Sequence, residues 1–177
     1  MNKEISEEDI KNLRIIREGV TSIIRETAET YDHDNLRVLD IAPEIWNGAQ
    51  EFFKKANVET LDIDQNSGAT FIADITKKNY QIIKDQTYDL VVFTEVLEHT
   101  LNPFDSIEEI YRILKIGGVL VMTTPFNFRI HNPLPDCWRI SEHGLRHLLR
   151  NFKSVSITQN GTDRFLFPVQ YKTIAIK

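Results

Sequence analysis

The chain has 177 residues, of which 41% are hydrophobic and 27% are charged, a composition typical of a folded globular protein and not of a disordered chain. We expect a single domain over residues 1–177, because this length suits one core and is short for two. The net charge is -5 with acidic and basic residues interleaved, which disfavours nucleic acids and anionic membranes as partners.

Cysteine content and the N-terminal sequence both bear on the cellular compartment. The single cysteine, Cys137, excludes an internal disulfide and a Cys-x-x-Cys zinc or redox site. Residues 1–9 are acidic and polar where a secretory signal needs an apolar core, and no later apolar run approaches the ~20 residues of a membrane span. We therefore expect a cytoplasmic protein, monomeric or homodimeric.

The first elements alternate between helix and strand patterns. Apolar residues recur at helical spacing from Ile10 and predict an amphipathic helix that ends near Tyr31, so residues 1–32 should pack on the core as an N-terminal helix. Residues 36–42 form a short apolar run with β-branched residues, which predicts a strand buried on both faces. A helix is predicted over residues 45–56.

The middle of the chain continues this alternation. Strands are predicted over residues 58–63, 70–73 and 88–93, and a strand–helix–strand order implies a right-handed parallel unit. The pair Asn102-Pro103 combines a capping side chain with proline at the first helical position, so a helix should begin there. This helix is predicted to end at residues 114–118, where glycine permits a left-handed cap.

The C-terminal part adds a loop and three strands. A strand over residues 119–123 precedes a proline-bearing, lid-like loop over residues 125–140 and a short helix over residues 141–150. Two final strands, 152–158 and 169–176, follow without an intervening helix, which indicates an antiparallel edge. The fold class predicted from the whole pattern is α/β, doubly wound, with a mostly parallel sheet.

Open parallel sheets bind ligands outside the carboxyl ends of their strands, at the switch in strand order. The residues predicted at those ends are Asp40, Asp62, Thr94, Glu95, Thr124 and Pro125. Asp62 follows Asp40 by about twenty residues, the spacing at which a carboxylate can accept hydrogen bonds from a ribose diol. Asp64 competes for that role, and both residues could instead only turn the chain, as aspartate often does after a strand.

Several segments, taken together, resemble the class I S-adenosylmethionine-dependent methyltransferases. Small members of that family carry the patterns V-L-D-x-G, F-D-x-V, L-E-H and R-x-L-K-x-G-G in this order. The corresponding segments here are Val38–Ala42, Tyr88–Val91, Leu97–His99 and Arg112–Gly118. One branch of the family also carries P-x-x-x-x-x-H, D-x-W-R-x-T and G-L, which is similar to the stretch with Pro125, His131, Asp136, Trp138, Arg139 and Gly144-Leu145. The resemblance extends over residues 36–176.

This resemblance implies a Rossmann-like fold with seven strands, helices on both faces and an antiparallel last strand. It also implies that S-adenosylmethionine lies across the ends of the first, second and fourth strands. Asp40 would face the methionine end of the cofactor, Asp62 its ribose and Asp74-Ile75 its adenine. Thr94 and Glu95 would line the cleft toward the methyl group, and Ala42 would belong to the cofactor loop. For Glu98 and His99 a structural hydrogen-bonding role is favoured over catalysis.

The first loop departs from the family pattern. The family has glycine at alternate positions after the first aspartate, whereas this chain has Ala42, Glu44 and Trp46. Glycines there let the backbone approach the ligand, and side chains take up that space. Gly48 could permit a different turn. The loop therefore raises an alternative function, a catalytically degenerate methyltransferase-like domain that serves as a binding or assembly module.

The leading hypothesis is methyl transfer from S-adenosylmethionine to a small-molecule or saccharide-like acceptor. If the acceptor is a hydroxyl, His131 is the candidate general base and Asp136 could orient it. The alternative is that His131, Asp136 and Arg139 only hold the lid by packing and an ion pair. No metal site is expected, because the helical pair His143 and His147 lacks an evident third ligand.

Overall fold

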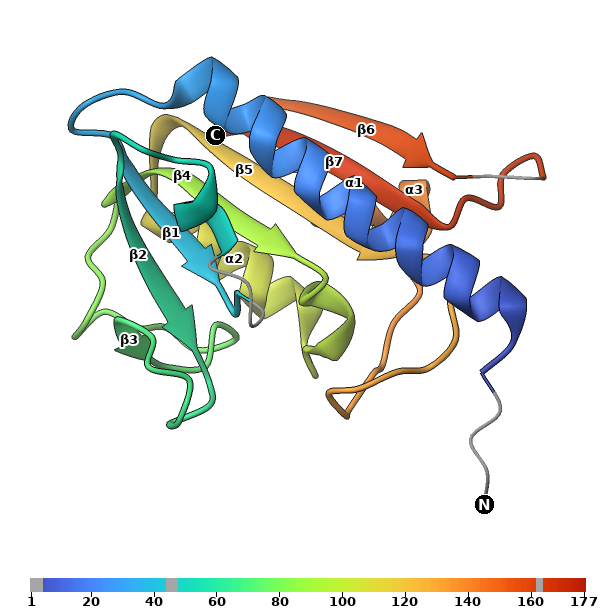
Figure 1. The fold of residues 1–177 in the computed structure, drawn as a ribbon. Coiled ribbons are helices and arrows are strands. Elements are labelled where there is room, and N and C mark those ends of the chain that lie inside the picture. Colours follow the sequence, from blue (N-terminus) through green and yellow to red (C-terminus); the bar gives the residue numbers. More distant parts are fainter. Residues whose placement is uncertain (1–4, 44–47, 162–163) are drawn as a thin grey trace.

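The computed structural model describes residues 5–43, 48–161 and 164–177. Within these residues one seven-stranded sheet has the order β3-β2-β1-β4-β5-β7-β6 (Figure 1). The strands are β1 Arg37–Ile41, β2 Asn57–Asp62, β3 Phe71–Ile72, β4 Tyr88–Thr94, β5 Leu114–Pro125, β6 Ser154–Asn160 and β7 Gln170–Ile176. The helices are α1 Glu7–Tyr31, α2 Pro103–Ile113 and α3 Glu142–Leu148, with short 3-10 helices η1 Gly48–Glu51 and η2 Leu97–His99.

The sheet is parallel except around its last strand. Neighbours from β3 to β5 pair in parallel, whereas β7 is antiparallel to both β5 and β6. The predicted fold class, a mostly parallel α/β sheet with an antiparallel last strand, is confirmed. The final hairpin places β7 inside the sheet and leaves β6 at the edge.

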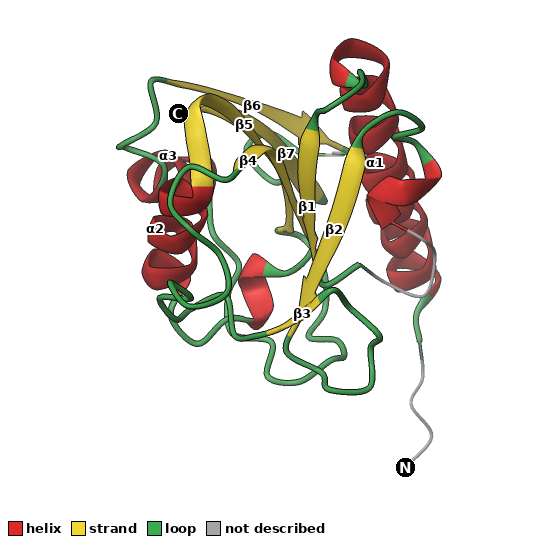
Figure 2. Cartoon of the chain, turned by 90° about the vertical axis from the view of Figure 1, so that its left-hand side faces the viewer, coloured by secondary structure: helices red, strands yellow, loops and turns green. Residues whose placement is uncertain are grey.

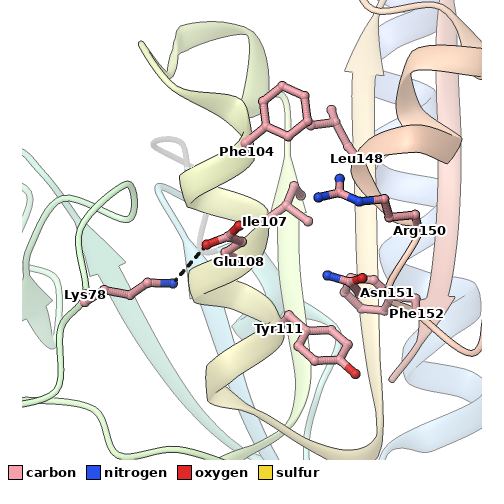
Figure 3. Close-up of a pocket in the computed structure, with 9 residues that line it drawn as sticks. All are labelled: Lys78, Phe104, Ile107, Glu108, Tyr111, Leu148, Arg150, Asn151 and Phe152. Carbon is pink, nitrogen blue, oxygen red and sulfur yellow. Dashed lines mark ion pairs between the residues drawn. The ribbon is translucent and has the colours of Figure 1, made fainter.

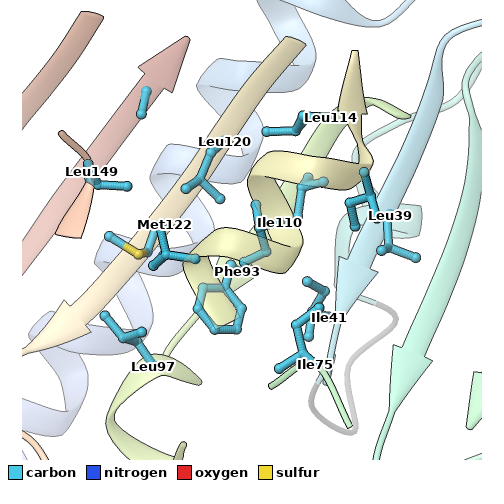
Figure 4. Packing of buried hydrophobic residues seen from close by; sticks show 14 of the residues in the cluster. Leu39, Ile41, Ile75, Phe93, Leu97, Ile110, Leu114, Leu120, Met122 and Leu149 are labelled. Atoms are coloured by element: carbon cyan, nitrogen blue, oxygen red, sulfur yellow. The ribbon is translucent and has the colours of Figure 1, made fainter. Parts of the chain in front are cut away.

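Helices cover both faces of the sheet, with α1 on one face and α2 and α3 on the other (Figure 2). Side chains of a strand alternate between these faces. Val38, Leu90 and Val92 pack in the cluster that includes Ile23 and Ile24 of α1. The intervening strand residues, among them Leu39 and Phe93, pack in a second cluster with Ile110 of α2 (Figure 4). The continuous apolar runs of β1 and β4 reflect this burial on both faces.

The N-terminal helix α1 begins and ends where its sequence indicates. Ser6 Oγ accepts the Asp9 N–H at 3.0 Å and the Asp9 carboxylate accepts the Ser6 N–H at 3.2 Å, which satisfies two free donors of the first turn. The helix ends at Tyr31, as predicted, and packs against β5 and β7. None of the helices in the described ranges is long and apolar enough to cross a membrane.

The helix predicted over residues 45–56 is wrong over its C-terminal half. Residues 48–51 form the single-turn 3-10 helix η1, and residues 52–56 are turn and bend. The carboxylate of Asp32 accepts the backbone N–H groups of Lys54, Lys55 and Ala56 at 2.8 to 3.1 Å. Those donors would bond to carbonyls one turn earlier in an α-helix, so this side chain replaces helical hydrogen bonds.

The start of α2 is confirmed and its predicted glycine cap is wrong. Asn102 Oδ1 accepts the N–H groups of Phe104 and Asp105, and Pro103 occupies the first turn. After Ile113 the chain turns directly into β5, because Leu114 adopts an extended conformation and pairs with Tyr88 of β4. Gly117, with φ of +78°, lies in the irregular part of this pairing instead of capping the helix.

Candidate active site

The parallel strands bring the predicted acidic residues to one edge of the sheet. Asp40 pairs in register with Thr60 of β2 and Val92 of β4, so Asp62 and Thr94 each lie two residues further toward the carboxyl end. Asp62 is in register with Ile72 of β3. Asp74 follows the end of β3 by two residues. The structure therefore gathers these residues on four adjacent strands.

Asp40 is a buried acid at the centre of this edge. Its side chain is only 2% exposed, and its Oδ2 accepts the N–H of Ala49 at 2.7 Å. Burial raises the pKa of Asp40 to about 7, although the Ala49 hydrogen bond acts in the opposite direction. A carboxylate in this environment is stabilised by any cation that binds beside it.

The loop after β1 folds closely around Asp40. Ala42 has φ of +50°, and its N–H donates to the carbonyl of Leu61 at 2.7 Å. Gly48 also has positive φ, +49°, and a Cβ at that position would collide with the Asp40 carboxylate. Glycine at position 48 thus supplies the close approach that the sequence pattern assigns to earlier positions. Glu44 and Trp46 lie outside the described residues.

Asp62 and Asp64 occupy different places in the structure. Asp62 is the last residue of β2, and its Oδ1 accepts the N–H of Asp64 at 2.8 Å. Asp64 is exposed, and its own Oδ1 accepts the N–H of Asn66 at 2.9 Å. Asp62 thus both turns the chain and lies at the strand end beside β1, whereas Asp64 belongs to the next turn.

Asp74 and Ile75 lie beyond the end of β3. Asp74 Oδ1 accepts the Thr76 N–H at 2.8 Å and the Thr76 hydroxyl at 2.7 Å. Ile75 is 6% exposed and packs in the core beneath α2. The local turn at Asp74 fixes this loop next to the end of β2.

Glu95 connects the end of β4 to the N-terminal helix. It has φ of +54°, and its N–H donates to the carbonyl of Thr123 at 3.0 Å. Its Oε1 accepts the Nε2 of Gln170 at 2.8 Å, and the same nitrogen donates to the carbonyl of Ile16 in α1 at 3.2 Å. Gln170 is fully buried, so this junction fixes Glu95 between β7 and α1.

The loop over residues 126–140 is held by a dense polar network. Arg139 donates to both oxygens of Asp136, at 2.6 and 2.7 Å. Burial acts to raise the pKa of Asp136, but the hydrogen bonds from Arg139 and from the His131 N–H, together with the charge of Arg139, lower that pKa to about 2. Trp138 Nε1 donates to the carbonyl of Thr100 at 2.8 Å, and the Cys137 N–H donates to the carbonyl of Glu98 at 2.7 Å. These bonds fasten the loop to the turn after β4.

His131 lies inside this network, beside the residue predicted to orient it. Its Nδ1 is 2.9 Å from Asp136 Oδ2, but the two groups are not aligned to form a hydrogen bond. The backbone N–H of His131 donates to the same oxygen at 2.9 Å. Burial lowers the pKa of His131 and outweighs the opposing effect of Asp136.

Glu98 and His99 of η2, for which a structural role was favoured, lie close to His131 in the structure. The Oε1 atom of Glu98 lies 3.7 Å from His99 Nε2 and 3.9 Å from His131 Nε2. The rings of His99 and His131 meet edge to face with centroids 4.9 Å apart. The L-E-H pattern marked the first two residues, but no spacing rule connects them with a histidine 32 positions later.

Comparisons with known proteins now identify the fold. Residues 19–122 match the family model described as a methyltransferase domain. The chain belongs to this methyltransferase family. Comparison with curated proteins gives no significant match.

Solved methyltransferases share the architecture at low identity. A SAM-dependent methyltransferase from Archaeoglobus fulgidus is 18% identical with a TM-score of 0.66, over 91% of this chain and 94% of that one. The N-methyltransferase NodS from Bradyrhizobium japonicum WM9 is 15% identical with a TM-score of 0.67, over 93% and 97%. A SAM-dependent methyltransferase from Methanosarcina mazei is 17% identical with a TM-score of 0.62, over 85% and 96%. The chain thus has the class I fold of these SAM-dependent methyltransferases.

The residues at the carboxyl edge fit the cofactor of these methyltransferases. S-adenosylmethionine carries an ammonium group and a sulfonium, and the buried Asp40 carboxylate has one hydrogen-bond donor, Ala49, among the residues that the structure describes. The absent side chain of Gly48 keeps the backbone close to Asp40. A cationic ligand and a buried, sparsely bonded carboxylate are complementary in charge.

Two other features of this methyltransferase lie away from the strand ends. A pocket between α2 and α3 is lined by Phe104, Ile107 and Tyr111 on one side and by Leu148 on the other (Figure 3). No predicted site residue is among its described lining residues, so we do not assign the active site there. Within the described ranges, His143 and His147 of α3 have no third potential metal ligand beside them. The potential metal-binding group in those ranges consists of Glu98, His99 and His131.

Proposed function

We propose that S-adenosylmethionine binds across the ends of β1, β2 and β4, with Asp40 at its methionine end and Asp62 at its ribose. Asp74 and Ile75 lie toward the adenine in this arrangement. Ala42, Thr94 and Glu95 complete the proposed cofactor-binding set. The register of the parallel strands supports this arrangement, because it puts Asp40 and Asp62 on adjacent strands at the same edge.

We further propose that the acceptor is a small molecule or a saccharide-like compound with a hydroxyl group. The predicted lid-like loop over residues 125–140, of which Pro125 belongs to β5, acts as the lid over this acceptor. Trp138 is 39% exposed and fixed by its bond to Thr100, so it offers a rigid aromatic face on which a sugar ring can stack. The net charge of -5 disfavours a nucleic acid as acceptor. The exposed, unpaired Cys137 is compatible with the proposed cytoplasmic location.

The position of His131 is the observation on which the proposed general-base role rests. When bound, S-adenosylmethionine supplies a methyl group on a carbon that the sulfonium already activates for in-line displacement. The chain's contribution is alignment, which supplies about 7 to 11 kcal/mol in well-oriented systems. His131 accepts the hydroxyl proton at Nε2 as the carbon–oxygen bond forms, and Asp136 fixes the ring from the Nδ1 side.

The test is an acceptor screen that measures S-adenosylhomocysteine formation and product mass with hydroxylated small molecules and saccharides. We expect turnover with members of this panel, and a fall of about 10²- to 10⁴-fold in kcat for His131→Gln. His143→Gln, an exposed histidine on α3, is the matched control and should retain turnover. Transfer to amines alone, or equal rates in the two variants, would contradict the proposal.

A further inference from the structure

Glu98, His99 and His131 form a cluster of three potential metal-binding side chains. One ligand atom from each residue lies within 4.8 Å of the other two. Glu98 and His99 come from η2, and His131 comes from the lid. The two histidine Nε2 atoms approach the same carboxylate oxygen of Glu98, at 3.7 and 3.9 Å. Both separations exceed hydrogen-bond length, so neither Nε2 atom is hydrogen-bonded to Glu98.

The carboxylate of Glu98 is buried without a hydrogen bond. The residue is 1% exposed, and neither of its carboxylate oxygens finds a partner within the part of the chain that the structure describes. An unsatisfied buried carboxylate is costly, and proteins pair such groups with a cation or a metal ion. The charged groups that act on Glu98 are the carboxylates of Glu95 and Asp136 and the guanidinium of Arg139.

Each histidine is oriented with Nε2 free to coordinate. His99 Nδ1 lies 3.0 Å from the carbonyl oxygen of Pro135, which can only accept, so the ring hydrogen resides on Nδ1. His131 Nδ1 lies 2.9 Å from Asp136 Oδ2, and although this contact is not aligned as a hydrogen bond, the nearby carboxylate oxygen favours the hydrogen on Nδ1. Metal-binding histidines are commonly fixed in this way, by a carbonyl or a carboxylate at the second ring nitrogen.

From these observations we propose that Glu98, His99 and His131 bind a divalent first-row transition metal ion of the Zn²⁺ or Co²⁺ kind. Metal–ligand bonds of about 2.0 to 2.2 Å place tetrahedral ligand atoms roughly 3.4 Å apart, so binding contracts the two Glu98–histidine separations by only a few tenths of an ångström. Two imidazoles favour such ions over Mg²⁺ and Ca²⁺, which prefer oxygen ligands.

The metal would face the acceptor side of the cleft. The side chains of His99 and His131 are 13% and 23% exposed, whereas that of Glu98 is 1% exposed, so the open side of the cluster is the histidine side. Three protein ligands with one open position describe a catalytic rather than a structural metal site. As an extension that rests on the proposed function, an acceptor hydroxyl at the open position loses its proton more readily, and His131 then acts through the metal instead of as a free base.

The binding test uses the full-length, tag-free protein and does not depend on methyl transfer. Titration with CoCl₂ should give one ion per chain with visible absorption bands of a low-coordinate Co²⁺ site, and ZnCl₂ should displace it. Glu98→Gln and His131→Gln should each weaken Zn²⁺ binding by more than about 100-fold, because changes outside the ligand shell alone cost about 10- to 100-fold. His143→Ala is the matched control, since His143 and His147 are the alternative surface pair.

The outcomes separate this site from the proposed function. Both ligand variants should retain thermal unfolding transitions and S-adenosylmethionine binding close to wild type, which shows that the fold and cofactor site are intact. Metal binding without methyl transfer would support this site while the proposed function fails. A folded wild-type protein that binds neither ion at micromolar concentration would overturn the site, as would binding that survives both ligand variants and disappears in His143→Ala.

Discussion

Two regions differ in how their polar groups are hydrogen-bonded: the carboxyl edge with Asp40 and Asp62, called the cofactor edge after its proposed role, and the loop over residues 126–140 with its contacts, called the lid network. At the cofactor edge, Asp40 and Asp62 bind backbone N–H groups of the loops that directly follow their strands. In the lid network, the bonds join segments far apart in sequence, such as Trp138 with Thr100 and Cys137 with Glu98. Local turns leave the carboxylates available to a ligand, whereas the long-range bonds fix the position of a loop. The comparison teaches that this methyltransferase has few, local hydrogen bonds at Asp40 and Asp62 and many long-range ones in the loop over residues 126–140.

The lid network should respond most strongly to loss of Arg139. Arg139→Ala removes the partner of a carboxylate whose side chain is fully buried, so we expect the free energy of unfolding to fall by about 3 kcal/mol. Thermal and urea unfolding measure this loss. Arg146→Ala is the matched control, because the Arg146–Glu142 pair is exposed at helical i,i+4 spacing and should cost less than about 0.5 kcal/mol. Similar losses in the two variants would contradict a tightly fixed lid.

A change of Asp40 at the cofactor edge should raise the free energy of unfolding instead of lowering it. The pKa of Asp40 is about 7 in the folded protein against 3.8 when unperturbed, so folding retains its proton and wild-type stability falls as the pH rises from about 4 to 7. Asp40→Asn does not titrate and keeps an oxygen that can accept the Ala49 N–H. We expect it to stabilise the free protein by about 2 kcal/mol at pH 8 and by much less at pH 5.

Thermal unfolding at the two pH values measures this difference. The same variant should bind S-adenosylmethionine more weakly at pH 8, because it lacks the charge that faces the cationic ligand. A variant that is destabilised equally at both pH values would indicate that Asp40 serves the fold and not the cofactor.

The smallest effect is expected at Asp32, which holds the segment after η1 at the amino end of β2, away from the carboxyl edge. Asp32→Ala removes the acceptor for the N–H groups of Lys54, Lys55 and Ala56, and should cost about 1 kcal/mol, as loss of a helix-capping side chain does. Asp34→Ala, an exposed neighbour, is the control. Urea unfolding of both variants would sharpen the comparison, since equal midpoints would show that the Asp32 contacts contribute nothing measurable.

Sequence patterns predicted the sheet well because its central strands are buried on both faces. The apolar runs of β1 and β4 and the Asn102-Pro103 start of α2 each carry a local physical cause. The helix over residues 45–56 was wrong because the Asp32 carboxylate, more than twenty residues earlier, takes up its backbone donors. The glycine cap of α2 was wrong because strand pairing of Leu114 with Tyr88 ends the helix.

The candidate site was likewise predictable only where local strand patterns determine it. Asp40, Asp62 and Thr94 could be placed together from strand order alone, since parallel strands end at one edge. The approach of His131 to Glu98 could not, because it depends on the path of a loop that no periodicity describes. The role of Gly48 also depends on a close contact with Asp40 that becomes visible only in three dimensions.

The most direct test of the central claim is titration calorimetry of the purified protein with S-adenosylmethionine and S-adenosylhomocysteine. We predict micromolar dissociation constants, weakened at least about 10-fold by Asp62→Ala, because a charged hydrogen-bond acceptor contributes roughly 1.5 to 3 kcal/mol. Asp64→Ala, in the next turn, should leave the affinity unchanged. No binding at millimolar ligand, or equal affinity in wild type and Asp62→Ala, would contradict a cofactor site at the carboxyl edge.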